Sequence, residues 1–270
     1  MSGPTQTTSD DTGQARRLTH PVYVYGVIAA SDAAGLPDTA GLDGGSNTVR
    51  AVAEGRLAAL VSDLPPDHTP GSITDVQAHQ RVLSQAIEDR TVIPMRFGIV
   101  MDGDDEVRQS LLTRHAGELG DLLDRLDGRV QMMVRAFYAE DALLTDVLAL
   151  NPDLAQESAA LARRPEIETH AARARVGELL CDAVETRRQE VESALLDRLA
   201  AVSDDIELEP PTSDRVAFSA QLLVDRDHRA ALDALIHELS QALTGSMVFR
   251  YVGPLPPYSF ANLSLDADGA

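Results

Sequence analysis

The sequence predicts an α+β fold of two domains, each an antiparallel sheet with helices on one face. Short apolar runs typical of strands alternate with amphipathic stretches of helical period along the 270 residues. A chain of this length can build two modest hydrophobic cores. Two early runs, residues 49–53 and 57–61, are separated only by Glu54, Gly55 and Arg56. Such a hairpin is antiparallel, which argues against a doubly wound parallel sheet.

The N-terminal domain is expected over residues 21–127. A lead of residues 1–20, rich in Ser, Thr, Asp and Gln, precedes it and is predicted to be disordered. Strands are predicted at residues 22–30, 49–53, 57–61 and 92–100. Helices are predicted at residues 72–90, begun by a Ser or Thr cap, and at residues 102–126, begun by a run of acids. Asp127 and Gly128 then mark the expected boundary between the domains.

The C-terminal domain is expected over residues 128–252. Strands are predicted at residues 130–138, 206–208, 216–224 and 247–252, and helices at residues 142–150, 153–162, 166–200 and 229–243. With the helical insertion set aside, the order β-α-β-β-α-β is that of a ferredoxin-like domain. The helix over residues 166–200 would be roughly 50 Å long. Its narrow apolar stripe, from Ile167 to Leu199, is expected to pack on the sheet or to pair with another helix.

Residues 253–270 are predicted to form a proline-rich tail. Its three prolines fix φ and lack a backbone N–H, so the tail is not expected to extend a sheet or a helix. The chain has five Tyr, five Phe and no Trp, and this short tail holds Tyr258 and Phe260. We therefore expect these two rings to anchor the tail in a groove between the two domains of the same molecule.

The charge and composition of the chain exclude several classes of function. The net charge of −20 argues against binding nucleic acid, whose phosphates need clustered cations, and it disfavours an anionic membrane surface. No apolar run is long enough to span a bilayer, and the single Cys181 cannot form an internal disulfide. We therefore expect a soluble cytoplasmic protein whose partners are basic or apolar.

The residue patterns of known catalytic and metal sites are not found in this sequence. The seven histidines are far apart and have no cysteine partner, so no metal site is expected. The acids from Asp102 to Glu106 lack the spacing of a calcium loop and are interpreted as a helix start. A glycine-rich phosphate loop and a nucleophile elbow are also missing. The sequence therefore predicts no catalytic residues, no cofactor and no enzymatic activity.

Two segments with unusual sequences carry a resemblance to a known family. One is Pro94-Met95-Arg96-Phe97-Gly98, and the other is Gly253-Pro254-Leu255-Pro256-Pro257-Tyr258-Ser259-Phe260. With the opening strand and the helix that carries His79, they occur in the order found in the gas vesicle F/L family (GvpF and GvpL). The resemblance extends from about Val22 to Phe260, and the composition, with no lysine among 23 basic residues, is of an actinobacterial type.

The resemblance implies a function in gas vesicle assembly. Members of this family are accessory proteins, thought to bind the small apolar shell protein GvpA, and some are minor components of the vesicle. An acidic, soluble binder could act as a chaperone that keeps apolar strand and helix surfaces dispersed. Other accessory Gvp proteins are further expected partners. The alternative from another class is a small-molecule sensor or an enzyme built on ferredoxin-like domains.

The candidate site residues are those of the family motifs, and each has a structural and a partner-binding interpretation. They are His79, Arg96, Phe97, Gly98, Gly253, Pro254, Pro256, Pro257, Tyr258 and Phe260. His79 lies on an apolar helix face, where a hydrogen-bonded core residue is the simpler interpretation. Arg96 stands inside an apolar strand, so we expect its guanidinium to be buried and bonded to a carboxylate or to main-chain carbonyls, linking the first sheet to its neighbour.

Overall fold

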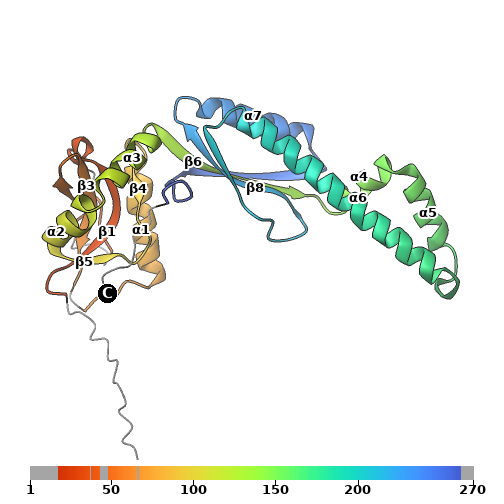
Figure 1. Cartoon of the computed structure of the whole chain (residues 1–270), viewed down its shortest axis with the longest axis horizontal. Coiled ribbons are helices and arrows are strands. Elements are labelled where there is room, and N and C mark those ends of the chain that lie inside the picture. The colour runs from red at the N-terminus through yellow and green to blue at the C-terminus, as the bar shows by residue number, and fades with distance from the viewer. Residues whose placement is uncertain (1–17, 37, 43–47, 66, 263–270) are drawn as a thin grey trace, which may run out of the picture.

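The computed structural model of the protein describes residues 18–36, 38–42, 48–65 and 67–262. Most of the predicted disordered lead therefore lies outside the described residues. The two antiparallel sheets and a helical arm follow one another along the long axis of the molecule (Figure 1). The predicted α+β class with two antiparallel sheets is confirmed, while the proposed domain boundaries stay a proposal.

The N-terminal sheet is built around a hairpin and a fully buried strand. Its strands are β1 (Pro21–Ala29), β2 (Arg50–Glu54), β3 (Leu57–Asp63), β4 (Ile93–Pro94) and β5 (Val100–Asp102), and a short 3₁₀ turn, η1 (Ala30–Ala33), follows β1. The order is β2-β3-β1-β4, with β5 also pairing with β1, and every pair is antiparallel. The hairpin prediction is confirmed. The single strand predicted at residues 92–100 is wrong, because the chain bends away from β1 between β4 and β5.

Helices cover both faces of the N-terminal sheet. One face packs on α1 (Ile73–Ala86), and the other packs on α2 (Gly103–Glu106), the π-helical η2 (Val107–Thr113) and α3 (Ala116–Leu126). The expectation of helices on one face is therefore wrong for this sheet. The physical reason is that β1 is apolar at successive positions, so its two faces both need cover.

The C-terminal sheet has helices on one face, as predicted. Its order is β7 (Asp205–Leu208), β8 (Val216–Asp225), β6 (Arg129–Tyr138) and β9 (Met247–Leu255), with antiparallel pairs throughout. The covered face packs on α7 (Arg229–Ala242) and on the last turns of α6 (Glu166–Ala200). The ferredoxin-like interpretation of this strand order stays a prediction.

A helical arm extends away from the C-terminal sheet (Figure 1). It consists of α4 (Ala142–Leu150), α5 (Pro152–Ala162) and the first half of α6. Only the C-terminal part of the apolar stripe predicted along α6 packs on the sheet. Leu195 and Leu199 pack in the core of the C-terminal sheet, whereas Ile167 is 93% exposed. The arm therefore has little core of its own.

Candidate functional site

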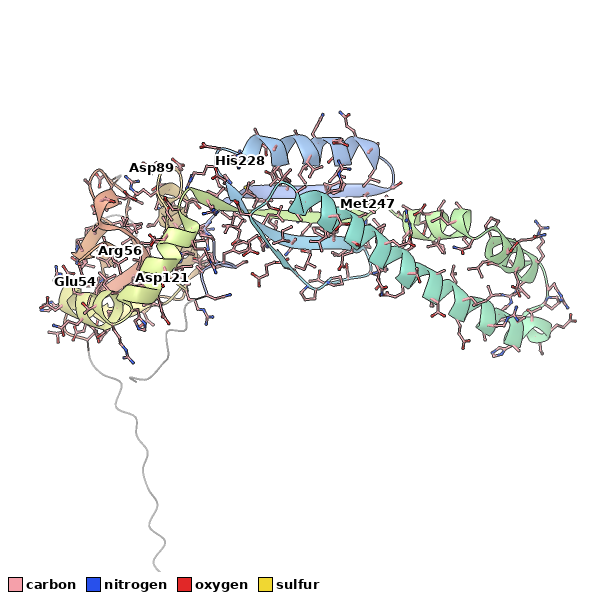
Figure 2. The ribbon with its side chains drawn as sticks, turned by 45° about the horizontal axis from the view of Figure 1, so that its top comes forward. Glu54, Arg56, Asp89, Asp121, His228 and Met247 are labelled. Atoms are coloured by element: carbon pink, nitrogen blue, oxygen red, sulfur yellow. The ribbon has the colours of Figure 1, made fainter. Side chains whose placement is uncertain are left out.

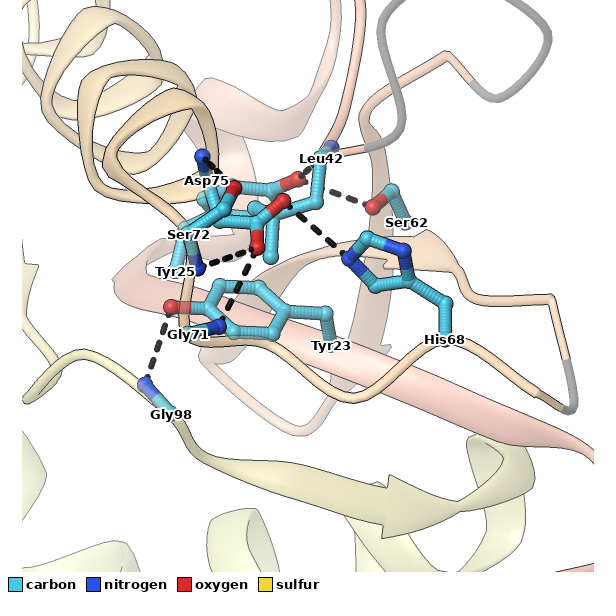
Figure 3. A network of polar contacts seen from close by, with 9 residues as sticks. All are labelled: Tyr23, Tyr25, Leu42, Ser62, His68, Gly71, Ser72, Asp75 and Gly98. Atoms are coloured by element: carbon cyan, nitrogen blue, oxygen red, sulfur yellow. Dashed lines mark hydrogen bonds and ion pairs between the residues drawn. The ribbon is translucent and has the colours of Figure 1, made fainter.

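Two tyrosines of β1 begin a buried polar network beneath α1. Side chains alternate along a strand, so Tyr23 and Tyr25 share the α1 face. Their rings meet edge to face with centroids 4.8 Å apart. The Tyr25 hydroxyl lies 2.8 Å from Ser62 Oγ and accepts the N–H of Leu42 at 3.0 Å (Figure 3). The Tyr23 hydroxyl accepts the N–H of Gly98 at 3.0 Å, and burial raises its pKa.

His79, one of the family-motif residues, is the centre of this network. It is fully buried on α1, with Nδ1 2.9 Å from the Tyr23 hydroxyl and Nε2 2.8 Å from the Tyr258 hydroxyl. A neutral imidazole carries one N–H, so the ring donates to one of these two hydroxyls and accepts the O–H of the other. Burial lowers the pKa of His79 to about 4, so the ring is neutral at pH 7. His79 is thus a buried, hydrogen-bonded residue, which is the simpler of the two interpretations given above.

The start of α1 is fixed by a second set of hydrogen bonds beside the tyrosines. The Asp75 carboxylate accepts the N–H groups of Gly71 and Ser72 at 3.1 and 3.0 Å, while Ser72 Oγ accepts the N–H of Asp75 (Figure 3). This capping box satisfies donors that a helix start leaves free. Burial would raise the pKa of Asp75, but these bonds and His68 lower it. The cap therefore positions His79 one turn further along α1.

The C-terminal tail crosses from the C-terminal sheet to the N-terminal one. Phe260 is 4% exposed and packs in the core between the N-terminal sheet and α3. Its carbonyl accepts a hydrogen bond from Arg125, and the N–H of Ser259 donates to Gln131 Oε1 at 3.1 Å. Pro256 and Pro257 are buried, and burial raises the pKa of Tyr258 to about 12. The tail thus joins the two halves within one molecule.

The first part of the tail belongs to the sheet, against expectation. β9 continues through Gly253 and Pro254 to Leu255, which pairs with Gln131 after an irregularity in the register. The predicted end at residue 252 is wrong because β9 is an edge strand, where a proline without N–H is tolerated. Gly253 has a φ of +155°, a backbone conformation that favours glycine over any residue with a side chain.

The Arg96-Phe97-Gly98 motif divides between buried and exposed positions. Phe97 is half-buried and its ring meets the His79 ring edge to face, with centroids 5.7 Å apart. Gly98 has a φ of +98°, a left-handed conformation that favours glycine. Arg96 is exposed and makes no hydrogen bond or ion pair with the part of the chain that the structure describes. The expectation that its guanidinium is buried is wrong, because the chain leaves the sheet at Met95 and turns Arg96 outward.

Arg226 makes the main-chain contacts that were expected of Arg96. It lies just after β8, and its guanidinium donates to the carbonyls of Ile87, Glu88 and Arg90 at 2.6, 3.1 and 3.0 Å. These carbonyls follow the end of α1, so a cation there is favourable. Burial lowers the pKa of Arg226. Sequence reasoning missed it because it stands in a polar turn, where an arginine carries no signal of burial.

A row of polar side chains on the uncovered face of the C-terminal sheet leads to the tail. Gln131 donates to Gln221 at 2.8 Å, and Gln221 donates to Glu209 at 2.8 Å. Arg135 and Ser219 also donate to Glu209, at 2.8 and 2.7 Å. Burial would raise the pKa of Glu209, but the bonds from Ser219, Gln221 and Arg135 lower it to about 2. Because Gln131 also accepts the N–H of Ser259, this row holds the tail from the side of the sheet.

The structure thus brings most family-motif residues together at the joint between the two halves. His79, Phe97, Gly98 and Tyr258 meet directly or through Tyr23, and Phe260 lies in the adjoining core. Gly253 and Pro254 lie in β9, and Arg96 points away. The partners that sequence reasoning missed are Tyr23, Tyr25, Gln131 and Arg226. Of these, only the two tyrosines could have been found from the sequence. They lie on an apolar strand, and the hydroxyl groups of buried tyrosines need hydrogen-bond partners.

The chemistry of this joint is that of a structural connection. Its polar groups are phenols, amides, one neutral imidazole and the guanidinium groups of Arg125 and Arg226, which donate to main-chain carbonyls. Within the described residues, no group of three or more His, Cys, Asp or Glu side chains could hold a metal ion. In the same residues, no helix is both long and apolar enough to cross a membrane.

Comparisons with known proteins agree with the sequence motifs. A model of the family described as "Gas vesicle synthesis protein GvpL/GvpF" matches residues 21–262. A gas vesicle protein F from Streptomyces sp. is 38% identical over 240 residues, which is 88% of this chain and 98% of that protein.

Crystal structures of GvpF from Anabaena sp. and Microcystis aeruginosa share the fold. Their TM-scores are 0.77 and 0.70, and both are 23% identical to this chain. The first match covers 91% of this chain and all of the other, and the second covers 90% and 99%. The chain belongs to the gas vesicle synthesis protein GvpL/GvpF family.

Proposed function

We propose that this protein is a non-enzymatic assembly factor for gas vesicles that binds the apolar shell protein GvpA. The observation that carries the proposal is the placement of the family motifs. They converge on a joint that holds the two halves together, and they do not converge on a set of catalytic groups. A protein whose family-specific residues fix its shape presents surfaces to a partner, so binding is the function that this geometry supports best.

The charge of the chain supports a partner that is apolar. At a net charge of −20 the chain repels other acidic macromolecules and stays soluble while bound to a hydrophobic subunit. We therefore propose a chaperone-like function in the cytoplasm, in which the protein holds the shell protein until it joins the growing vesicle and then remains there as a minor component. Other accessory Gvp proteins are further proposed partners.

Gene deletion combined with co-purification tests this proposal. Deleting the gene from an otherwise complete gas vesicle cluster should abolish or malform the vesicles, and the affinity-tagged protein should co-purify with the shell protein. Electron microscopy and cell buoyancy measure the first result. Normal vesicles in the deletion strain, with no paralogue present, would contradict the proposed function. Failure of the two proteins to co-purify would contradict the proposed partner.

A further inference from the structure

Both edges of the C-terminal sheet are unpaired in the part of the chain that the structure describes. There β7 pairs only with β8, and β9 pairs only with β6. Figure 2 shows Met247, the first residue of β9, at the end of the sheet next to the helical arm. Further along β9, Val248 is 63% exposed and Val252 is 39% exposed. An unpaired strand edge of this kind is a template for another strand.

The main-chain groups of β9 alternate between β6 and the open edge. The N–H of Ala139 donates to the carbonyl of Ser246 at 2.9 Å, just before β9 begins. In an antiparallel pair every second residue bonds the neighbouring strand, so Arg250 bonds β6. The N–H and C=O groups of Phe249 and Tyr251 therefore point outward from the sheet.

The main-chain groups of β7 alternate in the same way at the opposite edge. The N–H of Glu209 donates to the carbonyl of Ser219 at 2.9 Å, so the residues that point outward from β7 are Ile206 and Leu208. The N–H of Ile206 donates to the Asp205 carboxylate at 2.9 Å in place of a strand partner.

Two charges of opposite sign stand at these edges, on the uncovered face of the sheet. Arg250 on β9 is exposed and stacks on the Phe137 ring, 5.8 Å from its centroid. Glu207 on β7 is exposed as well. Neither forms an ion pair within the described residues. Because Phe249 and Ile206 pack toward the helices, Arg250 and Glu207 both face the other side.

The two edges match each other in direction and in side-chain pattern. Three antiparallel pairs separate β7 from β9, so β7 of a second copy lies antiparallel to β9 with its helices on the same side. One register sets Arg250 opposite Glu207 of that copy, at a non-hydrogen-bonded pair, where side chains approach most closely. The same register sets the outward main-chain groups of Phe249 opposite those of Leu208, whose side chain is 42% exposed.

The twist of the sheet keeps the bulky ends of two such copies apart. Neighbouring strands rotate by about 20–25°, so a copy added after four strands is turned by roughly 80–100°. The strands run along the long axis of the molecule, with the N-terminal half at one end and the arm at the other (Figure 1). The rotation therefore carries both ends of the second copy away from those of the first.

We propose that β9 of one copy of this chain pairs with β7 of the next, joining the C-terminal sheets head to tail through Arg250 and Glu207. Such a contact is heterologous, so copies add in sequence to form a ring or a filament. Pairing of two β9 edges or of two β7 edges brings like charges together and is disfavoured. The four residues of β7 keep the contact small, so the association is weak. This inference goes beyond the proposed function and does not depend on it.

Sedimentation velocity of the full-length protein tests the contact. The mass of the wild type should rise between about 10 µM and 1 mM protein in about 0.15 M salt, which screens the repulsion between copies of net charge −20. Arg250→Glu and Glu207→Arg should each weaken this association by about tenfold or more, because each sets like charges opposite one another. Arg81→Glu is the matched control. Arg81 is exposed on α1, and this substitution changes the net charge as Arg250→Glu does, so the association should persist.

Charge exchange makes the test independent of any loss of folding in a single variant. An equimolar mixture of Arg250→Glu and Glu207→Arg should associate again, because each β9 edge then meets a β7 edge of opposite charge. The double variant should also associate. A wild type that stays monomeric over the whole range overturns the proposal, as do single variants that associate like the wild type or a mixture that stays monomeric. If only Arg250→Glu weakens the association, the β9 edge pairs with something other than β7 and the proposed contact is wrong.

Discussion

At the scale of single residues, the sequence context of two arginines does not indicate which of them makes buried contacts. Arg96 stands among apolar residues and is exposed, while Arg226 stands in a polar turn and bonds three carbonyls of the other half. Local sequence describes a residue's neighbours along the chain. The carbonyls that hold Arg226 are more than 130 positions away in the sequence, so no local pattern could reveal them.

Substituting each arginine by alanine should separate the two cases. Arg226→Ala leaves three carbonyls at the end of α1 without their cation and should lower the free energy of unfolding by about 1.5–3 kcal/mol. Arg96→Ala removes a side chain without partners in the described structure and should change it by less than about 0.5 kcal/mol. Urea unfolding of both variants measures the difference. A larger loss for Arg96→Ala would show that the assignment is wrong.

The neutral imidazole of His79 should make stability depend on pH. Its pKa is lowered to about 4 in the folded protein, against 6.5 as the ordinary value, so the unfolded chain binds a proton first as the pH falls. The contribution of neutral His79 to the free energy of unfolding is complete above pH 6.5. It is lost as the pH falls from about 6.5 to 4, and the total loss is roughly 3 kcal/mol. The pKa of Glu209 is lowered from 4.5 to about 2, so its contribution to stability is lost between about pH 4.5 and 2, mostly below the range in which His79 acts.

Urea unfolding at pH 7 and pH 4.5 measures this loss, and His79→Gln should reduce it. An NMR titration of the His79 ring in the wild type is the check that does not depend on a variant folding. A His79 titration near pH 6.5 would contradict the predicted mechanism.

At the scale of helices and strands, clear end signals located most elements, and prediction failed where distant contacts decide. The strands at β6 and β8 and the helices α4 and α6 lie close to their predicted ranges, and glycine or proline marks several of their ends: Gly128 before β6, Pro152 after α4 and Pro165 before α6. The chain between β4 and β5 was missed, because the Tyr23 hydroxyl holds Gly98 in a turn. The break of the second helix into α2, η2 and α3 was also missed.

The tail shows which part of a site a sequence can predict. Docking of Tyr258 and Phe260 followed from prolines that stiffen the segment and from rings that need cover. Their partners could not be predicted, since His79 lies 179 residues from Tyr258 and Gln131 lies 128 residues from Ser259. Pairing between such distant residues depends on the assembled fold.

At the scale of the whole molecule, the tail should hold the two halves in one arrangement. Ending the chain after Leu255 spares β9 and removes Tyr258 and Phe260. Loss of a buried phenylalanine alone costs about 3–5 kcal/mol, so the melting temperature should fall and the radius of gyration should rise. Calorimetry and small-angle X-ray scattering measure these two changes.

Deletion of residues 263–270 is the control for this truncation, because it leaves Tyr258 and Phe260 in place. That protein should melt like the full chain. If the chain that ends at Leu255 kept its melting temperature and compactness but lost the shell protein, the tail would be a ligand for the partner.

The place of Phe260 has a consequence for synthesis on the ribosome. Apart from Leu223, the other buried members of its core lie between Val22 and Leu126 and are made much earlier. A nascent chain that has not yet reached residue 260 therefore cannot complete this core, however much of the sheet has formed. Phe260 supplies the ring that closes this core, so a chain stalled before residue 260 keeps an apolar gap open to chaperones and proteases.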